Sequence, residues 1–346
     1  MKSFIYNDIE KSTYNIISDL ELLKNKSILI TGGTGFVGTW LSYTLSFLND
    51  EYDFNCKIIL LSRNQTEFKN SHKELFMKNN ISFISSDIRS ISNLPDKINF
   101  IIHAASSPDN RIHMSDPVNT IDIISNGTKR ILDEATRLPY LEGILHLSSG
   151  QVYDCHVSKN KNMEENKLSN SIKSIYANAK AYSEITCLSY QSQHKLPITI
   201  SRPFSFIGPF QELSKPWAIN SFIQESMNNQ PMRIVGNGKP QRSYLYGSDM
   251  ATWLLVLLAN GDRGGIYNVG SSHGISLKNI TKKINKILPE KIDVIIQNYN
   301  VDSSIFIPNL KLIKEKLRVT ETFTFEEALE RTIKWNLNKR NNYEKS

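Results

Sequence analysis

The 346-residue chain has few of the residues and patterns that several functional classes require. Its three cysteines neither suggest a disulfide framework nor have metal-ligand spacing, and its seven histidines form no HExxH pattern, so we expect no metal site. No long apolar run is present, and the first 26 residues mix acidic and apolar side chains, unlike a signal peptide or a membrane anchor. These absences predict a protein of the reducing cytoplasm that has no membrane partner.

The charge of the chain also lacks a pattern. The formal net charge is +7 and the pI is about 9.1, but the lysines are scattered and no nucleic-acid recognition motif accompanies them. We therefore expect no nucleic-acid partner. Aromatic and aliphatic content is ordinary for a globular protein, which argues against a disordered or fibrous chain.

A glycine-rich turn follows the first short apolar run, at residues 28–30, and leads into an apolar-periodic segment. The spacing suits a sharp backbone turn at Gly32, the approach of a large anion at Gly35 and close packing of a helix at Gly38. Amides at the start of that helix would face a pyrophosphate. A strand-to-helix turn that binds nothing would give the same three glycines, so the rest of the chain must decide.

Apolar runs of strand length alternate with helical segments along the first 200 residues. This alternation is typical of a doubly wound parallel sheet. We also expect a leading amphipathic helix within the first 26 residues, beside the first strand. The predicted strands are residues 57–61, 81–85, 98–103, 143–147 and 197–201, and the predicted helices are residues 66–78, 118–135 and 176–193.

Two features predict how a dinucleotide would bind. The second strand ends at Ser62 and Arg63, where an acidic residue would bind the free ribose hydroxyl and an arginine would accommodate a 2′-phosphate. No acid is present there, so the sequence favours NADP(H) over NAD(H), although Arg63 could equally stack on adenine or point to solvent. Further on, the small side chains of Ala104 and Ala105 would let the backbone lie close to the cofactor.

A tyrosine and a lysine with a spacing of four open one predicted helix. Tyr176 and Lys180 would share a helix face, so the ammonium should lower the pKa of the phenol and let it exchange a proton with a substrate oxygen. A serine at the end of strand 143–147, Ser149, would orient the same oxygen. The pair alone is a weak signal, whereas the joint pattern is strong.

Taken together, these motifs resemble the extended short-chain dehydrogenase/reductases that act on nucleotide sugars, the epimerase/dehydratase family. The resemblance covers nearly the whole chain and implies a homodimer built on the helices that contain Val118 and Tyr176. It implies that Tyr176 is the acid/base, that Lys180 binds the nicotinamide ribose and tunes Tyr176, and that Ser149 binds the reacting oxygen. The residues that carry it are the Thr31–Gly38 segment TGGTGFVG, Asp87, Asn126, Ser149, Tyr176 and Lys180.

The same resemblance implies the two binding sites. We expect a nucleotide-diphosphate sugar to contact Ser149, Gln151, Ser205, Asn220 and Arg242, of which Ser205 departs from the usual asparagine and Arg242 matches the family's pyrophosphate arginine. Ser248 and Asp249 should cap the helix that follows. The predicted cofactor site comprises Gly32, Gly35, Phe36, Val37, Gly38, Arg63, Asp87, Ile88, Ala104, Ala105 and Lys180.

The resemblance also predicts a division of the chain. Residues 1–26 should form a helical extension, and residues 27–201 a Rossmann-type domain that carries the cofactor site and the catalytic residues. Residues 202–338 should form a smaller α/β subdomain for the nucleotide sugar, with some segments returning to the first domain. Residues 339–346 should be a frayed tail.

The residues beside Ser149 narrow the expected reaction. Family members that catalyse 4,6-dehydration place an Asp-Glu pair where this chain has Gly150 and Gln151, and neither can act as a carboxylate. Dehydration and UDP-glucuronate decarboxylation are therefore disfavoured. NADPH-dependent reduction of a 4-keto-6-deoxy nucleotide sugar is the leading prediction, and 4-epimerisation with a retained NAD is the alternative. A non-catalytic NADP-binding protein of the same fold is the least favoured.

Overall fold

The computed structural model describes residues 2–77, 79–155, 174–297 and 304–343. Seven strands form one parallel sheet in the order β10-β6-β5-β4-β1-β2-β3, which confirms the predicted α/β class and the doubly wound sheet. The chain therefore runs outward in both directions from β1. The strands are β1 (Ser27–Thr31), β2 (Lys57–Ser62), β3 (Ile81–Ser85), β4 (Phe100–His103), β5 (Gly143–Leu147), β6 (Ile198–Pro203) and β10 (Ile266–Val269).

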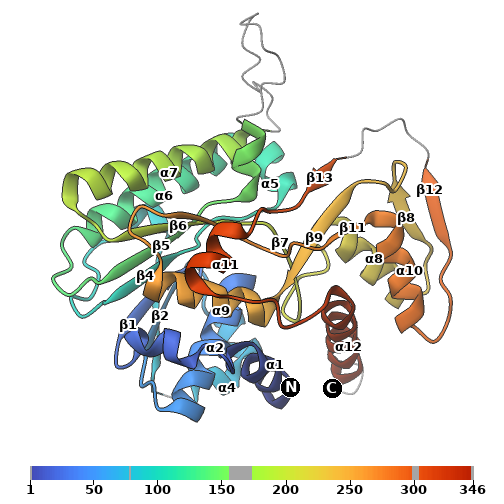
Figure 1. Cartoon of the computed structure of the whole chain (residues 1–346), viewed down its shortest axis with the longest axis horizontal. Helices are drawn as coiled ribbons and strands as arrows, with labels where there is room; N and C mark the ends of the chain where they lie inside the picture. Colours follow the sequence, from blue (N-terminus) through green and yellow to red (C-terminus); the bar gives the residue numbers. More distant parts are fainter. Residues whose placement is uncertain (1, 78, 156–173, 298–303, 344–346) are drawn as a thin grey trace, which may run out of the picture.

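Helices cover both faces of this sheet (Figure 1). Successive strand residues point to opposite faces: Ile28 and Ile30 pack into one core with α2 (Phe36–Tyr52) and α9 (Gly247–Asn260). Leu29, between them, packs into the second core. That core lies under α6 (Pro117–Ala135) and α7 (Ile175–His194). Burial on both faces explains the nearly continuous apolar runs of β1, β2, β4 and β5.

The start of the chain is not the single helix that the spacing predicts. It divides into α1 (Lys2–Thr13) and a 3-10 helix η1 (Ile17–Leu23), and α1 packs against α2 and α9 rather than beside β1. Tyr14 is 74% exposed at the break, although its spacing from Ile9, Ile17 and Leu20 predicts that it shares their apolar helix face. The break turns Leu20 into the core.

Two other helix boundaries also differ from expectation. The predicted helix 66–78 is interrupted at His72, which has φ −131° and separates α3 (Thr66–Ser71) from α4 (Lys73–Phe76). The His72 ring packs edge-on against Tyr43 and Phe210, which stack on each other. At the other end of the chain, α12 (Phe325–Tyr343) continues through much of the expected frayed tail, and residues 344–346 lie outside the described part.

The region after β6 builds two smaller sheets beside the main one (Figure 1). Strand β9 (Gln241–Tyr246) is the centre of the larger sheet and pairs with β7 (Ser205–Ile207), β11 (Gly274–Ser276) and β13 (Ile305–Phe306). The chain returns to the main sheet through α9 and β10. The remaining elements are η2 (Ile88–Ser90), α5 (Asn110–Ser115), η3 (Gly150–Cys155), α8 (Ala218–Met227), β8 (Met232–Val235), α10 (Leu277–Ile287), β12 (Val294–Gln297) and α11 (Lys311–Leu317).

None of the helices in the described ranges is both long and apolar enough to cross a membrane.

Candidate active site

The expected ligand-binding edge is set by the strand order. β1 pairs in parallel with β2 on one side and with β4 on the other. The strands after β1 are therefore added first on one side of it and then on the other, and the strand order reverses at β1. Ligands of open parallel sheets bind outside the carboxyl ends of the strands at such a reversal point. The glycine-rich turn follows β1, and the Ala104–Ala105 segment follows β4, so the sheet brings both to this edge.

Each glycine of the turn has a different steric reason. Gly32 has φ +67°, and a Cβ there would lie 2.8 Å from the carbonyl oxygen of Ala104. At Gly38, a Cβ would lie 2.5 Å from the carbonyl oxygen of Gly33, so α2 begins tight against the turn. A Cβ at Gly35 would meet only the Gly32 oxygen at 3.4 Å, and the space beyond it is open.

This geometry fits a dinucleotide. Gly35 is the N-cap residue of α2 and brings no side chain to the first turn, so the amides there are open to a pyrophosphate. The next two residues, Phe36 and Val37, are partly buried against the core and hold the start of the helix in place. The residues present therefore suit the cofactor that the sequence predicts.

The residues beyond β2 and β3 lie at the predicted adenosine end. Arg63 is exposed directly after β2. The carboxylate of Asp87 is already bound: Arg89 donates to both of its oxygens at 2.8 Å and, as the largest cause, lowers the pKa of Asp87 to about 2. Asp87 therefore stays ionised. Ile88 packs against Gly127 of α6, where a Cβ would lie 2.8 Å from the isoleucine side chain, which explains a glycine inside a helix.

The three predicted catalytic residues are brought together at the end of β5 and the start of α7. Ser149, Tyr176 and Lys180 are 8%, 6% and 4% exposed. The Tyr176 phenol lies near the Ser149 hydroxyl, which accepts from the Gln151 amide at 3.2 Å, and the Lys180 ammonium donates to the backbone oxygen of Leu147 at 2.7 Å. The Lys180 Nζ atom lies 5.9 Å from the centre of the Tyr176 ring. The sequence spacing of four residues explains why both side chains share this face of α7.

The expected lowering of the tyrosine pKa is wrong for this structure. Burial raises the pKa of Tyr176 to about 12, and the hydrogen bonds with Ser106 and Ser149 oppose this shift only in part. The pKa of Lys180 is in turn lowered to about 8 by burial. The cost of burying these two groups exceeds the attraction between their charges.

His113 is a site residue that the sequence analysis missed. Its ring from α5 stacks on Tyr176, with the ring centres 4.5 Å apart and the planes 9° from parallel. The imidazole Nε2 donates to the backbone oxygen of Ser107 at 2.7 Å, which fixes the plane of the ring. Burial lowers the pKa of His113, so the stacked ring is neutral at pH 7. No local motif marks this histidine, because α5 meets α7 only in the folded protein.

A buried charge network under the site was also missed. Glu184 of α7 accepts hydrogen bonds from Arg202 at 2.9 and 2.7 Å and a further short one from the Ser148 hydroxyl. The Arg202 guanidinium lies 4.7 Å from the centre of the Tyr153 ring, and Tyr153 donates to Asn268 of β10 at 2.9 Å. A carboxylate at position i+4 from Lys180 was visible in the sequence but had no apparent partner there.

Comparison with known proteins identifies the family. The model of the "NAD dependent epimerase/dehydratase family" matches residues 28–270. The chain belongs to this family. It is 31% identical over 277 residues to dTDP-D-glucose 4,6-dehydratase of Dictyostelium discoideum, across 75% of this chain and 61% of that protein. It is 27% identical over 330 residues to a trifunctional UDP-glucose 4,6-dehydratase/UDP-4-keto-6-deoxy-D-glucose 3,5-epimerase/UDP-4-keto-L-rhamnose-reductase of Arabidopsis thaliana.

That second alignment covers 90% of this chain and 47% of the plant protein, so the chain spans about half the length of its plant relatives. Solved structures share the fold. An epimerase of Methanothermobacter thermautotrophicus has a TM-score of 0.78 at 20% identity, covering 96% of this chain and 98% of that one. The UDP-glucuronic acid 4-epimerase of Bacillus cereus, solved with UDP-glucuronic acid and NAD, has a TM-score of 0.76 at 20% identity, covering 90% and 99%.

The two positions that follow Ser149 determine which groups lie beside its hydroxyl. A Cβ at Gly150 would lie 2.7 Å from the ring of Phe204, so this ring fills the space that a side chain at Gly150 would need. Gln151 is partly buried, and its backbone amide donates to the Ser149 hydroxyl at 3.2 Å. The loop positions the serine without placing a carboxylate beside it.

The predicted substrate residues lie in different environments. Asn220 is fully buried, and its side-chain amide accepts from Gln211 at 2.8 Å and donates to Glu212 at 2.9 Å, so it holds the 211–215 loop. Ser205 is partly exposed on β7. Arg242 is partly exposed on β9 and donates to the Ser304 hydroxyl at 3.1 Å.

The expected helix cap after Arg242 is wrong. Tyr246 is the N-cap residue of α9, and the Asp249 carboxylate accepts from the amides of Thr322 and Phe323 and from the Ser12 hydroxyl. Asp249 therefore connects three distant segments. Burial raises its pKa to about 6.

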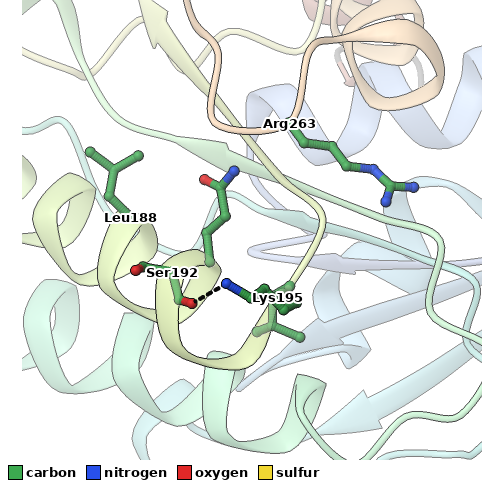
Figure 2. Close-up of a pocket in the computed structure, with 6 residues that line it drawn as sticks. Leu188, Ser192, Lys195 and Arg263 are labelled. Atoms are coloured by element: carbon green, nitrogen blue, oxygen red, sulfur yellow. Dashed lines mark hydrogen bonds between the residues drawn. The ribbon is translucent and has the colours of Figure 1, made fainter.

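A pocket far from these residues has no part in the chemistry. Figure 2 shows it at the end of α7, with Lys195 donating to the Ser192 backbone oxygen at 2.9 Å and Arg263 across the opening. Lys195 and Arg263 come just before β6 and β10, so the pocket is at the amino edge of the sheet.

Proposed function

We propose that this chain is an NAD(P)-dependent oxidoreductase that acts at C4 of a nucleotide-diphosphate sugar without dehydrating it. The leading activity is NADPH-dependent reduction of a 4-keto-6-deoxy nucleotide sugar. The observation that carries the proposal is the pairing of Ser149, Tyr176 and Lys180 in one buried site with Gly150 and Gln151, where a dehydratase would need carboxylates. The Phe204 ring beside Gly150 supports it, since it leaves no room for an aspartate.

The proposed chemistry assigns one task to each residue. A bound nicotinamide supplies the hydride. The Ser149 hydroxyl would donate a hydrogen bond to the C4 oxygen, and Tyr176 would donate a proton to it as negative charge develops. With a pKa of about 12, Tyr176 is protonated at rest, which suits reduction. The Lys180 ammonium would stabilise the phenolate left after proton transfer.

Preference for NADP(H) over NAD(H) rests on the end of β2. Arg63 is exposed there and lies close enough to Asp87 to contribute to the lowering of its pKa. A 2′-phosphate near Arg63 would find a guanidinium suited to bidentate binding. Solved relatives contain NAD and NADH, so the preference is a property proposed for this chain alone.

Epimerisation at C4 is the second candidate. It needs the same three residues. Tyr176 would first accept the proton of the C4 hydroxyl and would return it to the C4 oxygen after the 4-keto sugar has rotated in the site. Solved structures of similar fold favour it, because they include 4-epimerases, one of them in complex with NAD. An epimerase would retain its cofactor, whereas a reductase would exchange it in every cycle.

The proposed substrate-binding side is the region after β6. Relatives have been solved with UDP-N-acetylmuramic acid, UDP-glucuronic acid and UDP. Arg242 would donate to the pyrophosphate of a similar molecule, with Ser205 near the sugar. Asn220 would act through the loop that it holds, since its amide is already bonded.

A homodimer through α6 and α7 is also proposed. These neighbouring helices lie on the outside of the molecule (Figure 1), and they expose large apolar side chains. Exposed apolar side chains on two neighbouring helices would suit an interface, and a second copy would bury them in a four-helix arrangement. Sedimentation of the purified protein tests this. The exposed residues are Val118, Ile121, Tyr182, Ile185 and Leu188.

The proposed compartment is the reducing cytoplasm. Cys56 and Cys187 are buried free thiols in the described part of the chain. Such thiols suit a compartment in which disulfides do not form. Fractionation of cells that make the tagged protein tests the assignment.

The function is tested by identifying the cofactor and then the turnover. Native mass spectrometry of the purified protein, followed by denaturation, identifies any bound nucleotide. We expect a site that fills with NADPH and then reduces a 4-keto-6-deoxy nucleotide sugar. Tightly held NAD with 4-epimerisation of a UDP- or dTDP-hexose would favour the second candidate. Formation of a 4-keto-6-deoxy product from such a hexose would overturn both.

A further inference from the structure

Three successive turns of α7 each bind one residue at the end of β5. Tyr176, Lys180 and Glu184 are spaced by four residues and lie on one helix face. The Tyr176 phenol lies near the Ser149 hydroxyl, Lys180 donates to the Leu147 oxygen, and Glu184 accepts from the Ser148 hydroxyl. The first two contacts belong to the proposed catalytic residues. The third has no role in the reaction described so far.

The third contact is made by a buried charged group, the carboxylate of Glu184. Glu184 is 5% exposed and Arg202, from β6, binds both of its oxygens. Burying a carboxylate carries a large desolvation cost, which this pair offsets only because its geometry is good. A serine hydroxyl and an apolar side chain would hold α7 to β5 at lower cost. The charge itself therefore calls for an explanation.

The surroundings of Lys180 supply one. The lysine is 4% exposed, and it faces Tyr176 and Cys187 on its own helix, His103 on β4, His146 on β5 and His113 on α5. Burial lowers the pKa values of all three histidines and raises that of Cys187, so these groups are neutral at pH 7. Tyr176 is neutral as well.

Glu184 lies one turn of α7 beyond Lys180 on the same helix face, and the two side chains bond to the adjacent residues Ser148 and Leu147, so its carboxylate is a negative charge close to the lysine. Burial is the main cause that lowers the pKa of Lys180 to about 8, and the charge of Glu184 opposes it. Cys187 would oppose it too if it were a thiolate, but it does not ionise in that range. Arg202 compensates Glu184 from the opposite side.

We propose that Glu184 is a positioning residue whose negative charge keeps the buried Lys180 side chain an ammonium ion and, with Ser148, holds the end of β5 under Tyr176. The proposal rests on the catalytic roles proposed above for Tyr176 and Lys180. The buried ion pair of Glu184 and Arg202 would then control the protonation of Lys180 as well as the stability of the fold.

The test follows the protonation of Lys180 directly. Protein labelled with ¹³C at the lysine ε-carbons is titrated by NMR, with the Lys180 signal assigned through Lys180→Arg. The wild-type signal should titrate near pH 8. In Glu184→Gln, which keeps the shape and the Ser148 contact, the midpoint should fall by about one pH unit. This readout needs no substrate, so it is independent of whether the proposed activity is found.

Glu134→Gln is the matched control. Glu134 of α6 is 2% exposed and pairs with Arg130 and Arg137, both at 3.3 Å. Both substitutions should lower the melting temperature, but only Glu184→Gln should move the Lys180 midpoint. If turnover is found, the alkaline limb of the pH profile of kcat/KM should shift to lower pH in Glu184→Gln, as the Lys180 midpoint does. Deprotonation of Lys180 removes the positive charge that would stabilise the Tyr176 phenolate.

A second variant keeps the proposal testable if Glu184→Gln does not fold. Arg202→Gln leaves the Glu184 charge uncompensated and should raise the Lys180 midpoint, the opposite direction. Cys187→Ser should leave it unchanged. An unchanged midpoint in a folded Glu184→Gln or Arg202→Gln protein would overturn the proposal, and the ion pair would then be structural only.

Discussion

The catalytic end of the main sheet and the region after β6 are built differently. Ser149, Tyr176 and Lys180 are at most 8% exposed, and each is bonded to a residue of the sheet or its loops. Arg242 is partly exposed on β9, whose neighbour β13 has two residues. Large buried elements thus hold the reacting groups in advance, whereas the proposed substrate contacts depend on short strands. This difference agrees with the general finding that one fold can carry different substrate sites.

The largest effect on kcat is expected from a substitution at the catalytic end of the main sheet. Tyr176→Phe removes the proton donor and keeps the ring that stacks on His113, so kcat should fall at least about a hundredfold. Steady-state kinetics with the identified substrate measure it. Tyr182→Phe, on an exposed position of the same helix, is the control and should leave kcat unaltered. Near-normal turnover in Tyr176→Phe would remove Tyr176 as the acid.

The stability of the protein should depend on pH through the buried histidines of the main sheet, of which His103 on β4 is an example. Burial lowers the pKa of His103 to about 3 from an ordinary value near 6.5. The unfolded chain therefore binds the proton more tightly, and stability is lost as pH falls from about 6.5 toward 3, by about 1.4 kcal/mol per pH unit. Urea unfolding at pH 7.5, 6 and 5 measures the loss.

A pair of variants sharpens that result. His103→Gln can keep the contacts with Thr31 and Thr128 and does not titrate, so its stability should fall less steeply with acid. His273, in the region after β6, has a side chain that is 80% exposed, and His273→Gln should show the wild-type slope. Equal slopes in all three proteins would mean that His103 does not carry the effect.

In the region after β6, a smaller effect is expected on the KM for the substrate. Arg242→Ala should raise the KM for the nucleotide sugar about tenfold, because a charge-assisted hydrogen bond to a phosphate is worth 1.5 kcal/mol or more. The dissociation constant of the cofactor should not change. Arg233→Ala on neighbouring β8, where the arginine pairs with Glu225, is the control. An unaltered KM in Arg242→Ala would exclude Arg242 from the site.

The smallest effect is expected at the adenosine end. Arg63→Ala should reduce the preference for NADPH over NADH by about threefold, since an exposed ion pair is worth less than about 1 kcal/mol. Fluorescence titration with each cofactor gives the ratio. Lys57→Ala, at the opposite end of β2, should leave it as in the wild type. The phosphate role of Arg63 fails if both affinities stay the same.

The sheet was predictable because its signals are local. Strands that are buried on both faces have short apolar runs in their sequence. One glycine of the first turn, Gly38, follows from a contact with Gly33, five residues away. Errors arose where a distant partner decides the outcome. His72, at the helix break, contacts Phe210 from a distant segment, and Asp249 binds residues 322 and 323 instead of capping its own helix.

The sequence by itself determined the fold class, the family and the set of residues that meet at the end of β5, because period, spacing and motif are properties of the chain alone. Only the tertiary structure decided the electrostatics of that set. Whether Tyr176 is a phenol or a phenolate depends on how deeply it is buried and on which charges face Lys180. His113, Glu184 and Arg202 come to the site from α5, α7 and β6, and their effect exists only when those elements are packed together.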